Sequence, residues 1–197
     1  MSMFIKICGV TDVTAAETCV AAGVDAIGFV FSSSPRQVTP SQAASIADAI
    51  PDSIAKVAVF RRPSLAEIET VLAGFEADLV QADHDTMTDY EDVDLLPVYR
   101  ETDNSEPVRS RFLYEGAVSG VGRQVDLERA SKWGRLGEMI LAGGLRPGIV
   151  GYAIERVRPF GVDVSSGVEL EPGVKSPDLI RSFVRAVRSA ERRLVNT

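Results

Sequence analysis

The chain has 197 residues, of which 45% are hydrophobic and 25% are charged, proportions typical of a globular protein with one substantial core. Its net charge of −7, with no basic stripe in the sequence, argues against a surface that binds nucleic acid. No apolar run approaches the ~20 residues that span a bilayer, and a strand pattern at Phe4 leaves no room for a signal peptide. We therefore expect a cytoplasmic protein with neither a membrane nor a nucleic acid as partner.

The single histidine and the two cysteines limit the metal and redox chemistry. One histidine cannot supply a multi-histidine metal site, and the spacing of Cys8 and Cys19 fits no metal motif. A disulfide is not expected in a cytoplasmic protein. The sequence therefore predicts no bound metal.

The first half of the chain alternates short apolar runs with helical patterns. The apolar runs predict strands at 4–8, 25–31, 55–60 and 79–81. The patterns between them predict helices that end at 22, 50 and 72. In the first helix, capped by Thr11 or Asp12, the spacing places Val13, Ala16 and Val20 on the buried side.

The second half repeats this alternation with an interruption. Strands are predicted at 95–99, 112–115, 139–142 and 162–164. Helices are predicted from about 127 and at 147–157 and 175–194, with a weak helix at best at 87–94. Pro97 makes its strand the least secure, and the polar segment 101–110 is expected to replace a fifth helix with a loop.

Eight strands in this order predict an all-parallel sheet closed into a barrel. We expect a compact (β/α)₈ TIM barrel that forms a single domain over residues 1–197, with a reduced or missing fifth helix. An open doubly wound sheet is the alternative, but no GxGxxG motif follows the first strand.

Small residues follow the last two predicted strands. Gly143 and Gly144 come after the seventh strand, and Ser165, Ser166 and Gly167 come after the eighth. Small residues at a strand end let backbone N–H groups approach an oxyanion, and a helix N-terminus adds a favourable dipole. Either turn alone would be ordinary, but the pair matches the phosphate site of (β/α)₈ barrels. The sequence therefore predicts phosphate binding here.

Charged residues are also expected inside the barrel. Alternation places Lys6 and Asp163 on the faces that carry Cys8 and Ser165, on strands that are neighbours in a closed barrel. A buried lysine is costly unless it is paired. We therefore predict an ion pair between Lys6 and Asp163 one layer below the site.

Four blocks of residues carry a resemblance to a known family. They are Lys6-Ile7-Cys8-Gly9-Val10-Thr11, Gly28-Phe29-Val30-Phe31 with Ser34-Pro35-Arg36, Leu141-Ala142-Gly143-Gly144-Leu145, and Val162-Asp163-Val164-Ser165-Ser166-Gly167-Val168-Glu169. Over nearly its whole length the chain resembles the phosphoribosylanthranilate isomerases of tryptophan biosynthesis. The first and last blocks together form a specific signature, whereas either alone would be a moderate one.

The resemblance implies an Amadori rearrangement of N-phosphoribosylanthranilate to the aminoketose carboxyphenylamino-deoxyribulose phosphate, without metal or organic cofactor. It makes Cys8 the general base that removes the proton from the sugar carbon next to the anomeric centre. It makes Glu115 the general acid that protonates the ring oxygen, and Arg36 the residue that holds the anthranilate carboxylate. The residues that would bind the phosphate of this phosphosugar are Gly120, Gly122, Gly143, Gly144, Ser165, Ser166 and Gly167.

Elementary chemistry agrees with these roles. Opening a furanose while moving a proton needs an acid and a base on opposite sides of the sugar. A thiol can act as the base where its thiolate is stabilised, and Lys6 could do this for Cys8. Asp126 is a rival to Glu115 as the acid, but it lies at a predicted helix start, where capping explains it.

The sequence departs from the family pattern at two places. The family usually has aspartate after strand six, where this chain has Glu115, and Gln-Leu-His-Gly after strand four, where this chain has Gln81-Ala82-Asp83-His84. These changes keep open a barrel that binds a sugar phosphate but has lost this activity or acts on another aminoaldose phosphate. A metal-dependent epimerase would need two histidines, which the chain lacks. The oligomeric state is left open between monomer and homodimer.

Overall fold

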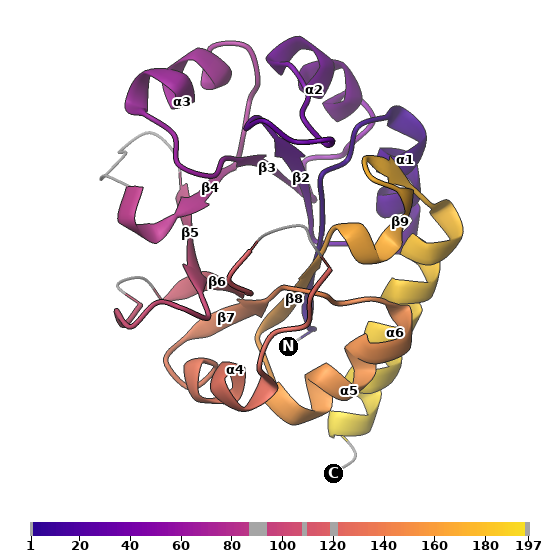
Figure 1. Ribbon diagram of the computed structural model, residues 1–197. Helices are drawn as coiled ribbons and strands as arrows, with labels where there is room; N and C mark the ends of the chain where they lie inside the picture. Colours follow the sequence, from indigo (N-terminus) through magenta and orange to yellow (C-terminus); the bar gives the residue numbers. More distant parts are fainter. Residues whose placement is uncertain (1, 87–93, 108–109, 119–121, 196–197) are drawn as a thin grey trace.

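The computed structural model describes residues 2–86, 94–107, 110–118 and 122–195. In these residues eight parallel strands close into a barrel in chain order, and β8 pairs with β1 (Figure 1). The strands are β1 (Phe4–Cys8), β2 (Ala26–Val30), β3 (Ala55–Val59), β4 (Leu79–Asp83), β5 (Asp94–Arg100), β6 (Arg111–Glu115), β7 (Glu138–Leu141) and β8 (Gly161–Val164). The predicted (β/α)₈ barrel is confirmed, and the open sheet is excluded.

Six α-helices of the described residues surround the barrel (Figure 1). They are α1 (Val13–Ala22), α2 (Pro40–Ala47), α3 (Leu65–Leu72), α4 (Leu127–Trp133), α5 (Pro147–Val157) and α6 (Pro177–Val195). The predicted loss of a fifth helix is confirmed for the described part of the segment between β5 and β6. The weak helix expected at 87–94 falls, except for Asp94, outside the described residues.

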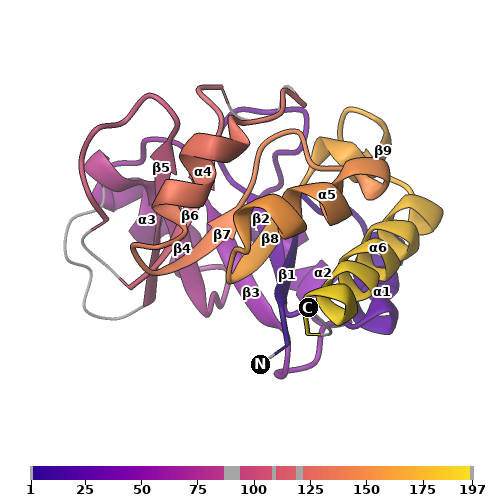
Figure 2. The ribbon, with the colours of Figure 1, turned by 90° about the horizontal axis from the view of Figure 1, so that it is seen from below.

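The segment after β8 has structure that the sequence analysis did not predict. It forms the 3₁₀ turn η2 (Ser166–Val168) and a hairpin of β9 (Glu169–Glu171) and β10 (Val174–Lys175). A second 3₁₀ turn, η1 (His84–Thr86), follows β4. Figure 2 shows the barrel from the side, with the N-terminus at one end and β9 near the other, where the strands finish.

Side-chain caps set the beginnings of the first three helices. The Asp12 carboxylate accepts from the backbone N–H of Ala15 at the start of α1. Helices α2 and α3 begin with capping boxes, formed by Thr39 with Gln42 and by Ser64 with Glu67. Each cap ends a loop that runs from a strand to its helix, so the caps hold the loops at the end of the barrel where a site is expected.

Alternation along the strands separates two apolar layers. Ile5 and Ile7 of β1 pack between the sheet and the helices. Phe4, Lys6 and Cys8 point into the barrel, which is filled by two clusters of side chains. Because the interior is packed, the barrel is no pore, and room for a ligand exists only at its ends.

The buried face of α1 differs from the prediction at Val13, whereas the predicted strand at 95–99 is confirmed as β5. Val13 is 41% exposed, and the buried face of α1 consists instead of small residues. They are Ala15, Ala16, Thr18 and Cys19, and their size allows a close approach of α1 to its neighbours. The strand β5 is longer than expected and keeps Pro97 at its centre, because Leu96 and Val98 on either side fill the barrel interior.

The predicted ion pair between Lys6 and Asp163 is confirmed. The two residues are partners in the register of β1 and β8, and Nζ donates to Oδ1 at 2.8 Å. Lys6 is fully buried. Burial alone would lower the pKa of Lys6, but the Asp163 carboxylate, with Cys8 nearby, raises it, so the lysine is charged. The pair therefore joins the first strand to the last by a charge-assisted bond.

Removing one partner of this pair should destabilise the barrel strongly. We expect Asp163→Asn or Lys6→Met to lower the free energy of unfolding by roughly 3–5 kcal/mol, because the remaining charge is buried without a partner. Urea denaturation measures this change. Glu138→Gln is the control, since it breaks the exposed pair with Arg111 between β6 and β7 and should cost no more than about 1 kcal/mol. Losses of similar size in all three variants would contradict the prediction.

Candidate active site

The carboxyl ends of the strands surround a cavity of about 180 Å³. Its walls combine one thiol with several charged and polar groups. The polar and charged residues of its lining include Cys8, Arg36, Gln81, Asp83, Arg100, Glu115, Asp163 and Ser165. Catalysis in (β/α)₈ barrels takes place at this end. We call this cavity the barrel mouth.

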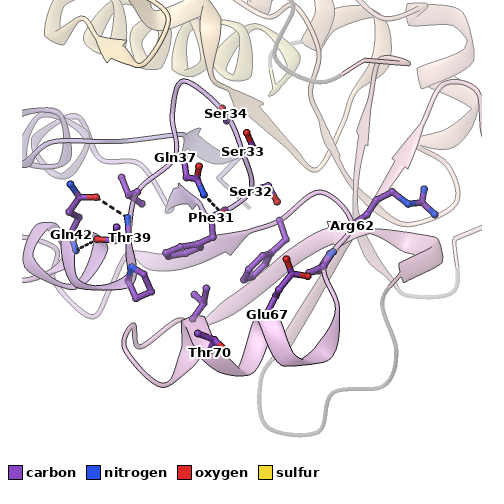
Figure 3. Close-up of a pocket in the computed structure, with 15 residues that line it drawn as sticks. Phe31, Ser32, Ser33, Ser34, Gln37, Thr39, Gln42, Arg62, Glu67 and Thr70 are labelled. Carbon is purple, nitrogen blue, oxygen red and sulfur yellow. Dashed lines mark hydrogen bonds between the residues drawn. The ribbon is translucent and has the colours of Figure 1, made fainter.

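A larger hollow of about 760 Å³ lies beside the mouth, next to the starts of α2 and α3 (Figure 3). Several of its polar side chains already have partners of their own. Thr39 and Gln42 bond each other, Glu67 caps α3, and the Gln37 amide donates to the Phe31 carbonyl. Polar groups that satisfy one another leave little to bind a substrate. We therefore place the candidate site in the barrel mouth.

Cys8 is the last residue of β1 and lies on the floor of the mouth. Gly28 of β2 makes room for it, because a Cβ at that position would lie 3.0 Å from the Cys8 sulfur and 3.2 Å from Lys6 Nζ. Burial raises the pKa of the Cys8 thiol, and Lys6 acts in the opposite direction. Lys6 thus stabilises the thiolate as expected, but burial and Asp163 outweigh it. The resting group is the thiol.

Arg36 reaches the mouth from the loop after β2. Its side chain passes over Gly9, where a Cβ would lie 2.6 Å from the arginine Cδ. Its Nε and Nη2 each donate to Glu169 at 2.8 Å. Within the described part of the chain, Nη1 makes no hydrogen bond, so it remains able to bind a carboxylate.

Glu169 is the centre of a network that the sequence analysis did not foresee. Besides Arg36 it accepts from Lys175 Nζ at 2.7 Å, and Lys175 also donates to the carbonyl and hydroxyl of Ser165. Burial alone would raise the pKa of Glu169, but Arg36 and Lys175 lower it. Glu169 and Lys175 belong to the β9–β10 hairpin, so the hairpin fixes both Arg36 and the end of β8.

The predicted phosphate-binding residues converge at the rim of the mouth. One small cavity is lined by Gly122, Gly143, Gly144, Ser165 and Ser166. Gly167 lines an adjoining hollow, and Gly120 lies outside the described residues.

Close packing between these turns demands glycine. Gly144 has a φ of +67°, and a Cβ there would lie 2.4 Å from the backbone nitrogen of Gln124. A Cβ at Gly167 would lie 1.8 Å from the Leu145 carbonyl oxygen. The turns after β6, β7 and β8 therefore lie in backbone contact at the rim of the mouth.

The far side of the mouth carries three charged residues in contact. Glu115 ends β6, and its Oε1 accepts from Arg100 Nη1 at 2.5 Å. Arg100 ends β5, and its Nη2 also donates to Asp83 at the end of β4. Arg100 lies one residue beyond the predicted strand, and alternation from Leu96 and Val98 places it on the inward face.

Other polar residues near the mouth differ in what they can do. Gln81 lines the cavity, and its buried Oε1 has no hydrogen-bond partner among the described residues, so it can accept from a substrate. His84 lies outside the cavity lining and packs against Tyr99, with ring centroids 4.2 Å apart. Asp126 caps α4 by accepting from Glu128 and Arg129 N–H groups, as the capping interpretation predicted.

The described residues contain neither a cluster of candidate metal ligands nor a helix that could cross a membrane. In them, no three or more histidine, cysteine, aspartate and glutamate side chains are grouped so as to hold a metal ion. Nor does any helix in those ranges have the length and apolar character needed to cross a membrane. The expectation that the chemistry needs no metal stays a prediction.

Comparisons with known proteins agree on one family. Residues 5–186 match the model of the N-(5'phosphoribosyl)anthranilate (PRA) isomerase family. An N-(5'-phosphoribosyl)anthranilate isomerase from Paramagnetospirillum magneticum is 37% identical, and the alignment covers 95% of this chain and 98% of that protein.

Solved structures show the same likeness. The crystal structure of phosphoribosyl anthranilate isomerase from Thermus thermophilus matches with a TM-score of 0.86 at 25% identity, covering 95% of this chain and 99% of that one. A phosphoribosyl anthranilate isomerase in complex with reduced 1-(o-carboxyphenylamino)-1-deoxyribulose 5-phosphate matches with a TM-score of 0.78 at 27% identity, with the same coverage.

The two cysteines should differ in their reaction with iodoacetamide. Cys8 lines the mouth, whereas Cys19 is fully buried in α1, where burial raises its pKa to about 12. Because the thiolate is the nucleophile and the Cys8 pKa is also raised, we expect Cys8 labelling to be slow at pH 7 and to accelerate above pH ~9. Peptide mass spectrometry measures both rates. Equal labelling of the two residues, or a Cys8 rate that is independent of pH, would refute this.

Proposed function

The chain belongs to the N-(5'-phosphoribosyl)anthranilate isomerase family, and from this premise we propose how its own residues carry out the reaction. The protein is an isomerase of tryptophan biosynthesis that converts N-phosphoribosylanthranilate, an aminoaldose, to the aminoketose carboxyphenylamino-deoxyribulose phosphate. The observation that carries the assignment of roles is that a thiol and a carboxyl, Cys8 and Glu115, face one cavity from β1 and β6.

The chemistry consists of two proton transfers. The carboxyl of Glu115 gives its proton to the ring oxygen as the bond between that oxygen and the anomeric carbon breaks, which leaves an iminium ion. The Cys8 thiol, once it has lost its own proton to solvent, removes as the thiolate the proton from the adjacent carbon, and the resulting enolamine tautomerises to the ketone. The proton of Glu115 ends on the former ring oxygen, and Cys8 ends with the proton of the substrate carbon. Cys8 then loses its proton to solvent and Glu115 takes one up, which restores both groups before the next turnover.

Substrate binding divides between the two rims of the mouth. The phosphate is held by backbone N–H groups at the turns that contain Gly122, Gly144 and Ser166, next to the start of α5. Arg36 binds the anthranilate carboxylate through Nη1, while Glu169 holds the rest of its guanidinium. The unpaired oxygen of Gln81 accepts from a hydroxyl or amine of the substrate.

Location and assembly are inferred from the sequence alone. A small phosphosugar is the partner that the mouth accommodates, and the acidic composition argues against nucleic acid. We expect a cytoplasmic enzyme that forms one barrel domain over residues 1–197 and exists as a monomer or a homodimer.

Replacing Cys8 should abolish most turnover without disturbing the fold. We expect Cys8→Ala to reduce kcat by about 10²–10⁴-fold, because a general base acts mainly in the transition state. The thermal unfolding midpoint and the affinity for inorganic phosphate should stay close to those of the parent. Cys19→Ala, in the helix behind β1, is the matched control and should keep its activity. Comparable turnover in Cys8→Ala would remove the thiol from the mechanism.

Substitutions at Glu115 should identify the acid. Glu115→Gln keeps the shape but loses the proton, so turnover should be abolished. Glu115→Asp keeps the proton but moves the carboxyl by about 1 Å, which can cost up to a hundredfold and still leave measurable activity. Asp126→Asn should retain much of the activity, because Asp126 serves as a helix cap. Normal turnover in Glu115→Gln would show that another group supplies the proton.

A further inference from the structure

Arg100 links two carboxylates at the end of the barrel where the acid lies. Backbone register aligns Arg100 with Glu115 of β6, and its guanidinium contacts Glu115 on one side and Asp83 of β4 on the other. The exposed fractions of the three side chains are 14%, 15% and 9%, and all three line the barrel mouth. A guanidinium is a rigid, planar donor. Its contacts with both carboxylates therefore define where each carboxylate lies.

We propose that Arg100 and Asp83 are positioning residues for the proton donor, with Arg100 fixing the carboxyl of Glu115 and Asp83 fixing Arg100. The inference rests on the proposed role of Glu115. It also accounts for both departures from the family pattern. A glutamate has one more rotatable bond than the aspartate usual at this position and so needs an additional anchor. The carboxylate in place of the strand-four histidine supplies the second contact of that anchor.

The charges of Arg100 and Asp83 should also affect the protonation of the Glu115 carboxyl. Burial alone would lower the pKa of Arg100, but Glu115 and Asp83 raise it, so Arg100 is charged throughout the working range. Arg100 favours the ionised form of Glu115, whereas Asp83 offsets part of that positive charge. Other charged or titratable groups face the mouth or its phosphate rim from β1, β8 and the loops, namely Lys6, Cys8, Arg36, Arg61, Arg123 and Asp163. These groups are unchanged in the variants below.

The test is the pH dependence of kcat in Arg100→Met and Asp83→Asn. Because burial raises the pKa of the Cys8 thiol above that of a carboxyl, Cys8 sets the alkaline limb of the profile and the Glu115 carboxyl sets the acidic limb. Removing the cation should move this acidic limb to higher pH by about one unit, and removing the Asp83 charge should move it to lower pH. At the optimum, kcat of Arg100→Met should fall about tenfold or more with KM changed less than threefold, because the loss is one of positioning in the transition state. Arg100→Lys should restore part of kcat and the parent limb.

Controls separate this inference from a general effect of charge or folding. Arg62→Met removes a cation from an exposed pair with Asp85 just outside the mouth and should leave the profile unchanged. Thermal unfolding shows whether each variant is folded, and if Arg100→Met is not, Arg100→Lys and Asp83→Asn still carry the test. Limbs that do not move, or that move in the same direction in both variants, overturn the positioning role. An active Glu115→Gln protein would instead overturn the proposed acid itself.

Discussion

The ion pair between Lys6 and Asp163 is the interaction on which the site depends. A fully buried ammonium group needs a carboxylate beside it, and here that carboxylate comes from the last strand of the barrel. The pair therefore helps to fix the register of β1 against β8. Two residues further along these strands, Cys8 and Ser165 reach the mouth side by side. The proposed base and the turn proposed to hold the phosphate are thus built on the same internal contact.

Two further networks fix the remaining parts of the mouth. Glu169 holds Arg36 and Lys175 on the side of the hairpin, and Arg100 joins the carboxylates of Asp83 and Glu115 on the side of β4 to β6. Each network connects elements that are distant in sequence. These two sets of described residues do not overlap, so the arginine proposed to bind the carboxylate and the proposed acid are held by different contacts. A reaction that needs its acid and its base apart is served by this separation.

The barrel, the centre of the site and the ion pair between Lys6 and Asp163 could be predicted, whereas the contacts of Glu169 and Arg100 could not. Cys8 and the turns after β7 and β8 can be recognised from local sequence patterns. The turns are small residues that follow apolar runs, and Cys8 lies in a block of residues that resembles the family. Arg100 was missed because its role depends on the register of β5 against β4 and β6, which is a long-range property. The β9–β10 hairpin was not predicted because it is short and mostly polar. Val13 was wrongly predicted to be buried, because only packing decides which side of α1 faces the core.

A crystal structure of this protein with reduced 1-(o-carboxyphenylamino)-1-deoxyribulose 5-phosphate would show whether Cys8 is placed to act as the base. We expect the phosphate to bind the backbone N–H groups around Gly144 and Ser166, and the aryl carboxylate to bind Arg36. We also expect the sulfur of Cys8 to lie within about 4 Å of the carbon that loses its proton, close to the geometry of attack. A complex in which that carbon faces another base, with Cys8 out of reach, would contradict the central claim that the thiol is the base.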